Sequence, residues 1–159
     1  MGNRNGIVLA AVCVAIMFAA GSIRAGTAVQ DVIKMENKAY SEHTKAIVEF
    51  SHKKHNEEYK IGCGDCHHDD KGKPLNDLKL GDNVQGCIEC HKIPGQMPGE
   101  LKKEMREKKV SKKEIAAKEL EYHAEAIHEN CITCHKKFNK ENKTKAAPQT
   151  CTQCHPKEK

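Results

Sequence analysis

The chain has 159 residues, of which 31% are charged and only 4% are aromatic, and it contains no tryptophan. So little apolar bulk excludes an ordinary globular core and, taken alone, would predict disorder. The chain also has a formal net charge of +5 and nine cysteines. What these two features mean depends on the group that takes the place of the missing apolar core.

Residues 1–25 have the features of a secretory signal peptide. Arg4 precedes an apolar run from Ile7 to Ala20, and a stretch with small residues ends at Ala25. The run is shorter than the roughly 20 residues that a membrane-spanning helix needs, and its length suits a signal peptide. We therefore expect export to the periplasm, cleavage after Ala25, and a single domain over residues 26–159. An uncleaved membrane anchor is the alternative.

Residues 26–49 form a polar arm, in which we expect short extended segments at either end. The arm leads into the stretch FSHKKHNEEYKIGCGDCHH at residues 50–68, which has four histidines: His52, His55, His67 and His68. Its last part has the pattern Cys-x-x-Cys-His, the attachment sequence of c-type haem. One haem needs at most one further iron ligand, so the surplus histidines predict that this stretch also reaches other irons.

The pattern occurs four times, numbered here motifs 1 to 4: Cys63, Cys66 and His67; Cys87, Cys90 and His91; Cys131, Cys134 and His135; Cys151, Cys154 and His155. The two thiols of such a motif bind the porphyrin, and the histidine binds the iron. Paired cysteines alone would equally fit structural zinc sites or disulfides. Neither alternative requires a histidine after each second cysteine, so the sequence predicts four covalently bound haem c groups.

Four haems would resolve the anomalous composition. Each porphyrin is a large apolar body, and its bonds to protein tie distant segments together, so cofactor binding would supply much of the folding energy. The propionates would make the loaded protein acidic, and the basic composition therefore does not indicate a nucleic-acid partner. The lysines from Lys136 onward could steer an acidic partner towards motif 4, or could be an ordinary solvated surface.

The rest of the chain alternates loops with helix. Residues 69–86 are rich in glycine, proline, aspartate and asparagine and predict a loop or hairpin, and residues 93–99 predict a second loop. Residues 100–129 lack glycine and proline, which predicts a long helix or two helices broken near Val110–Ser111. Met97, in the second loop, is an alternative iron ligand.

Histidines outside the motifs outnumber the four sixth ligands that the irons require: His43, His52, His55, His68, His123 and His128. Every iron can therefore be bound by two histidines. His67 and His68 are adjacent, so their side chains must diverge towards different irons. His52 and His55 are three residues apart and likewise imply two haems close together.

The run F-S-H-K-K-H, followed by C-G-D-C-H-H, resembles the haem-binding core of the tetrahaem cytochromes c3 of sulfate-reducing bacteria. The resemblance covers residues from about 46 to the end. It implies a small c3-like domain, mainly α-helix and irregular loops with little β-structure, organised around four clustered haems. All four motifs here are Cys-x-x-Cys-His, whereas many members of that family have longer spacing in the second and fourth. The long segment between His91 and Cys131 points towards the type II c3, which is found with a membrane-bound complex.

The same resemblance implies a ligand set for the irons. The implied pairs are His52 with His67, His68 with His91, His55 with His135, and His128 with His155. His123 is the alternative to His128 in the last pair.

The resemblance implies electron transport in sulfate respiration, between periplasmic hydrogenase and/or a membrane-bound redox complex. Ligand chemistry points the same way, because two histidines per iron leave no position for a small-molecule substrate and lack the methionine that raises the reduction potential. We therefore expect a low-potential electron carrier and not an enzyme. The alternatives are a multihaem reductase with one open iron and a membrane-anchored subunit of a redox complex.

Overall fold

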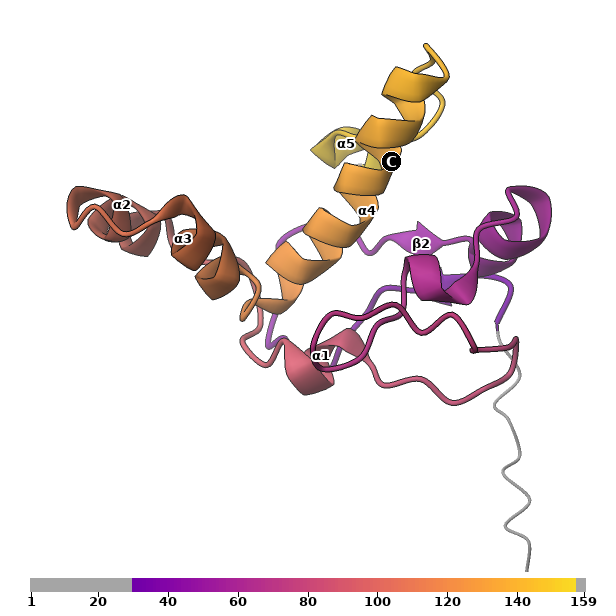
Figure 1. The fold of residues 1–159 in the computed structure, drawn as a ribbon, viewed down its shortest axis with the longest axis horizontal. Coiled ribbons are helices and arrows are strands. Elements are labelled where there is room, and N and C mark those ends of the chain that lie inside the picture. The colour runs from indigo at the N-terminus through magenta and orange to yellow at the C-terminus, as the bar shows by residue number, and fades with distance from the viewer. Residues whose placement is uncertain (1–29, 157–159) are drawn as a thin grey trace, which may run out of the picture.

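The protein consists of short helices joined by long irregular segments, with a small sheet near its N-terminal side (Figure 1). The computed structural model describes residues 30–156, so the expected signal peptide lies outside the described residues. Strands β1 (Ile33–Lys34) and β2 (Glu49–Phe50) pair antiparallel, with Ile33 opposite Phe50. The polar arm therefore has an extended segment towards each end, and these two segments pair with each other. Strand β2 leads directly into the histidine stretch.

Much of the haem-motif sequence forms single helical turns. The π-helix η1 (Lys54–Glu58) follows His52, and motifs 1, 2 and 4 contain the 3-10 helix η2 (Cys63–Asp65), α1 (Cys87–Cys90) and α5 (Cys151–Cys154). In each of the three motifs the histidine N–H donates to the carbonyl of the first cysteine, at 2.7–2.9 Å. This bond folds the backbone of the histidine back onto that of the first cysteine, so the two cysteines and the histidine of each motif lie within about one turn.

The turns of motifs 1, 2 and 4 begin in the same manner. The residue before the second cysteine accepts a hydrogen bond from the backbone N–H that precedes the first one, as Asp65 does from Gly62 at 2.8 Å. Glu89 and Gln153 make the equivalent contacts in motifs 2 and 4. This cap satisfies a donor that a helix start leaves free, and so it stabilises turns that are too short to persist alone.

Helix α4 (His123–Glu141) is the longest helix, and motif 3 lies within it. In Figure 1, α5 lies beside the C-terminal half of α4 and α1 lies near its N-terminal end. Helices α2 (Gly99–Glu107) and α3 (Lys112–Glu119) form a hairpin that projects away from the other elements. None of the helices within residues 30–156 combines the length and apolar character needed to cross a bilayer.

Of the two alternatives predicted for residues 100–129, a break near Val110–Ser111 is the one observed, and it has a local cause. Ser111 caps α3, since its Oγ accepts from the Glu114 N–H at 3.2 Å and the Glu114 carboxylate accepts from the Ser111 N–H at 3.1 Å. Lys109 adopts a left-handed conformation, with φ of 56°, which ends α2.

A second break, at residues 120–122, was not predicted, and the segment holds three helices instead of one or two. The cause is a long-range contact. Loop residues Ile93 and Gly95 present their carbonyls to the N–H groups of His123 and Ala124, at 2.8 and 3.0 Å. These bonds satisfy donors of the first turn of α4, so a new helix begins there without glycine or proline.

Buried apolar side chains are few in the part of the chain that the structure describes. Among the described residues they are Met97, Ile115 and Tyr122, 3%, 8% and 9% exposed, and all three belong to the hairpin or its base. Around the motifs, apolar side chains such as Val32, Val84 and Phe138 are about half exposed. The motif-bearing body, defined here as residues 30–96 and 123–156, thus contains no buried apolar side chain.

Candidate haem centre

Cysteines of all four motifs lie around the middle of α4. Asn130 donates from Nδ2 to the Cys66 carbonyl at 3.2 Å and so joins motif 1 to this helix. The Cys131 side chain is accessible to solvent, yet burial of its sulfur raises the thiol pKa to about 11. Neighbouring thiols add to this rise in the pKa, and they come from every motif: Cys66, Cys154, Cys87 and Cys134. Four segments that are distant in sequence therefore present their attachment residues to one region.

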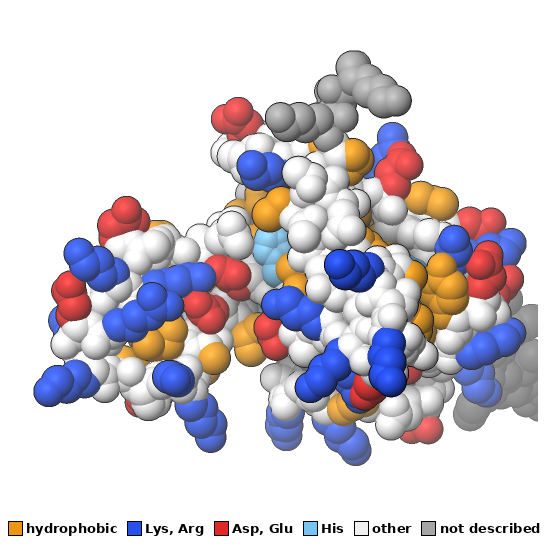
Figure 2. Space-filling model, turned by 90° about the horizontal axis from the view of Figure 1, so that it is seen from above, with side chains coloured by type: hydrophobic (Ala, Val, Ile, Leu, Met, Phe, Trp, Pro, Cys, Tyr) orange, Lys and Arg blue, Asp and Glu red, His pale blue; other side chains and the backbone are white. Residues whose placement is uncertain are grey.

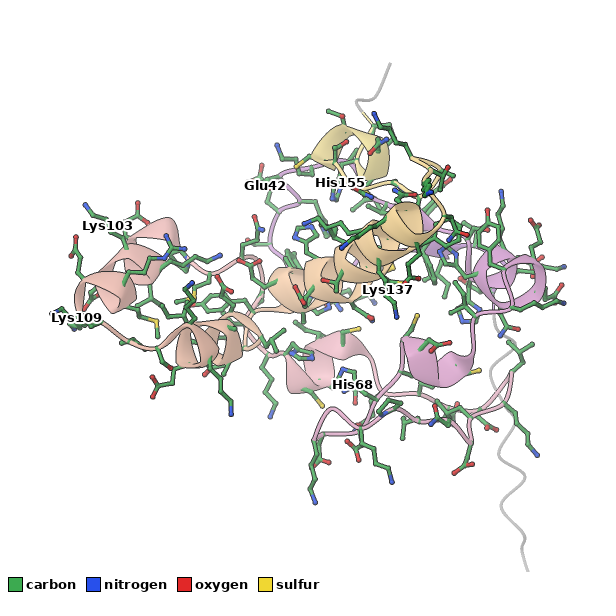
Figure 3. All side chains as sticks on the ribbon, turned by 45° about the horizontal axis from the view of Figure 1, so that its top comes forward. Glu42, His68, Lys103, Lys109, Lys137 and His155 are labelled. Carbon is green, nitrogen blue, oxygen red and sulfur yellow. The ribbon has the colours of Figure 1, made fainter. Side chains whose placement is uncertain are left out.

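Histidine rings from separate segments face each other in pairs. The separation of ring centroids is 6.1 Å for His55 and His135, 6.0 Å for His68 and His91, and 6.4 Å for His128 and His155. Figure 3 shows His68 on the side of α1 and His155 at α5. These are three of the four pairs that the resemblance implied.

The fourth implied pair, His52 and His67, is also close in space. The pKa of His67 is lowered first by burial and then by the neighbouring charges of His52 and His68. Among the described residues, His52 Nδ1 is the buried side-chain polar atom that lacks a hydrogen-bond partner. Leaving such an atom unpaired costs on the order of 1–3 kcal/mol.

Most of these imidazoles are oriented by backbone carbonyls. The Nδ1 atoms lie within hydrogen-bond distance of a carbonyl oxygen in five cases: His55 with Ser51, His68 with Asp69, His91 with Leu120, His135 with Pro148, and His155 with Ala46. A carbonyl can only accept, so Nδ1 has the proton and the lone pair of Nε2 is left free. This is the arrangement found in metal-binding histidines, whose second nitrogen is held by the surrounding protein.

The histidines outside these pairs have protein partners. His123 is 6% exposed, and its Nδ1 lies 2.9 Å from the Tyr40 hydroxyl. His43 stacks on the same tyrosine ring, with centroids 5.2 Å apart. Met97 is buried and lies just before the start of α2. His128, in contrast, faces His155.

The residues present fit haem c better than zinc or disulfides. Two imidazoles bound to one metal through bonds of about 2 Å have ring centroids roughly 6 Å apart, which matches the three measured pairs. The eight motif cysteines are free thiols, and within residues 30–156 no group of three or more histidine, cysteine or acidic side chains is arranged to hold a metal ion alone. A structural zinc would need four such ligands, whereas haem supplies the remaining ligands itself.

Several residues that shape this centre were not identified from sequence. Asn139 is 7% exposed and bonds both backbone groups of Ala147, which holds the segment before motif 4 against α4. Gly64, in motif 1, lies where a Cβ would be 2.4 Å from Asn76 Oδ1 and 2.9 Å from Asn76 N. Only glycine allows this approach of the loop. The carbonyls that orient the histidines leave no trace in sequence, because every residue has one.

Comparison with known proteins gives one match. The model of the class III cytochrome c family matches residues 27–155. The searches of curated proteins and of solved structures returned no match. The matched range includes the four motifs and all the paired histidines. The chain therefore belongs to the class III cytochrome c family, whose members bind haem c and transfer electrons.

Proposed function

We propose that this protein is a periplasmic electron carrier with four haem c groups, one attached at each motif. The proposed iron ligands are the pairs His52 and His67, His68 and His91, His55 and His135, and His128 and His155. Bound haem supplies a one-electron ferric/ferrous couple. The protein's own residues attach the porphyrin, orient both imidazoles and hold the four groups close together.

The observation that carries the proposal is the facing of imidazoles at 6.0–6.4 Å in pairs drawn from separate segments. One partner in each pair belongs to a motif and the other comes from elsewhere in the chain. The two imidazoles of each pair would both bind the iron of one haem, which would leave no iron with a site for a substrate. Histidine on both faces also favours a lower reduction potential than the histidine–methionine pair of other cytochromes.

A lysine-rich surface beside motif 4 supports an acidic redox partner. Its members are exposed on the C-terminal half of α4 and in the loop that follows: Lys136, Lys137, Lys140, Lys143 and Lys145. Opposite charge on a partner would raise the rate of encounter, and salt would weaken that effect. We propose hydrogenase and/or a membrane-bound redox complex as partners, and the long α2–α3 segment supports the type II c3 with which such a complex is associated.

The test is a redox titration of the purified haem protein followed by carbon monoxide. We expect four one-electron reductions per chain and no carbon monoxide complex at any haem of the reduced native protein. One haem that binds carbon monoxide would contradict a saturated carrier and would favour a reductase.

Two single variants show whether this assay can detect an open iron. His128→Ala removes a proposed ligand and should create one haem per chain that binds carbon monoxide. His123→Ala is the matched control on the same helix, five residues away, and should leave all four haems closed. Reversal of these two results would assign the ligand role to His123.

A further inference from the structure

The turn between α2 and α3 has a dense cluster of basic residues. Residues 106–113 contain Arg106, Lys108, Lys109, Lys112 and Lys113 against the single acidic residue Glu107, a formal charge of +4. We call residues 106–113 the hairpin tip. Basic side chains are the most numerous charged groups at the outer end of the hairpin in the space-filling view, with a few acidic ones among them (Figure 2).

Most of this charge is not neutralised within the chain. Lys108 forms an ion pair with Glu104 at 2.6 Å, and Glu107 forms one with Lys103 at 3.8 Å. Among the residues that the structure describes, no carboxylate lies within ion-pair distance of the other basic side chains of the tip, which are exposed: Arg106, Lys109, Lys112 and Lys113. Their charge is therefore available to a partner.

The hairpin presents its tip on a fixed base. Lys102 of α2 makes ion pairs with Glu119 of α3 at 3.0 Å and with Glu125 of α4 at 2.6 Å. All three side chains are less than one-third exposed, so solvent screens these contacts less than it screens the pairs nearer the tip. The buried Ile115 and the Ser111 cap hold α3 in place. Lysines on a rigid support lose less freedom on binding than lysines on a flexible chain.

The tip is well separated from the haem motifs. In Figures 1 and 3 the hairpin extends away from α1, α4 and α5, with Lys103 and Lys109 at its far end and His68 and His155 in the body. Contact at the tip alone would thus hold a partner without bringing it to an iron. It is also distinct from the lysine-rich surface beside motif 4, where Lys137 lies on α4.

The tip is suited to a charged protein surface and not to a bilayer. Within the hairpin, the exposed large apolar side chain is Leu120, at the base. Helices that lie in a membrane interface combine basic residues with exposed apolar or aromatic anchors, and residues 106–113 offer none of these.

We propose that the hairpin tip is a second docking surface, which binds a carboxylate-rich surface of a redox partner protein. This inference rests on the proposed carrier function for the nature of the partner. With a partner held at the tip, the whole molecule can pivot about that contact until a haem approaches the partner, which increases the fraction of encounters that lead to electron transfer.

Binding of a fluorescent oligoglutamate peptide to the haem-loaded protein tests the proposal. The triple variant Lys109→Glu, Lys112→Glu, Lys113→Glu should weaken binding at low salt by about tenfold or more. The matched control reverses three exposed lysines of the loop at residues 69–86, Lys71, Lys73 and Lys79, and should change the Kd by less than about threefold. The triple change to glutamine at the tip should weaken binding by an intermediate factor.

Three further readouts separate the possible failures. Haem absorption and redox titration of the tip variant should match those of the native protein, so loss of peptide binding cannot be mistaken for loss of the carrier function. Equal weakening of peptide binding by the tip and loop variants would overturn the proposal, because net charge alone would then explain it. Tip-dependent binding to phosphatidylglycerol vesicles without tip-dependent peptide binding would also overturn it, in favour of a lipid surface.

Discussion

The α2–α3 hairpin and the motif-bearing body are stabilised in different ways. The hairpin region includes all three buried apolar side chains among the described residues, Met97, Ile115 and Tyr122, and it has a capped helix and a bridging lysine. The body has single helical turns, free cysteines and facing histidines, while apolar side chains such as Phe138 remain half exposed. One region has a small set of buried apolar side chains, and the other has the cysteines and paired histidines that we propose as cofactor ligands.

This difference shows where the folding energy has to come from. A body with no buried apolar side chain cannot offset the conformational entropy that folding costs, about 1–2 kcal/mol per residue for the backbone alone. Covalently attached porphyrins would supply both the apolar surface and the cross-links.

Removal of the haems should unfold the body. In a variant with all eight motif cysteines changed to alanine, the amides of residues 30–96 should exchange at least about 1000-fold faster than in the haem-loaded protein, because no core remains to hold these segments. Residual helix should be confined to the hairpin helices, within residues 99–119. An unloaded protein that kept native protection at the motifs would contradict the proposed division of the molecule.

A change of one iron ligand should alter one haem and leave the hairpin intact. His128→Met should raise one of the four midpoint potentials, by on the order of 0.1–0.2 V, because a thioether favours ferrous iron more than imidazole does. Potentiometry measures the shift, and hydrogen exchange of residues 99–122 is expected to stay as in the native protein. Four unchanged potentials would show that His128 does not bind an iron.

A core substitution in the hairpin should destabilise the hairpin and leave the haems unchanged. Ile115→Ala removes the most buried side chain of α3 and should lower the free energy of local unfolding of the hairpin by about 2–3 kcal/mol. The four potentials should not move. Leu120→Ala, at a position that is 40% exposed, is the control and should cost less than about 1 kcal/mol. Equal effects of the two substitutions would argue against a core at this site.

Loss of the α3 cap should give the smallest effect. Ser111→Ala deletes the hydroxyl that accepts from the Glu114 N–H and should destabilise the hairpin by about 1 kcal/mol. Ser41→Ala, an exposed serine in the body, should have no measurable effect. Hydrogen exchange of residues 112–119 provides the measurement, and unchanged protection there would contradict the capping role.

The parts of this structure that sequence could predict are those encoded locally. The pattern Ser-x-x-Glu indicates the break at Val110–Ser111, and the four motifs are recognisable from three residues each. The pairing of His55 with His135 came from family resemblance, since spacing alone left the partners open. The break at residues 120–122 and the contact of His123 with Tyr40 depend on segments that are far apart in the chain, which local patterns do not record.

The central claim is that every iron has a histidine on both faces. Electron paramagnetic resonance of the oxidised protein, quantified against a haem count per polypeptide, tests it most directly. We expect four haems per chain and only low-spin ferric signals. Fewer than four haems, or a high-spin signal equal to one haem per chain, would contradict it.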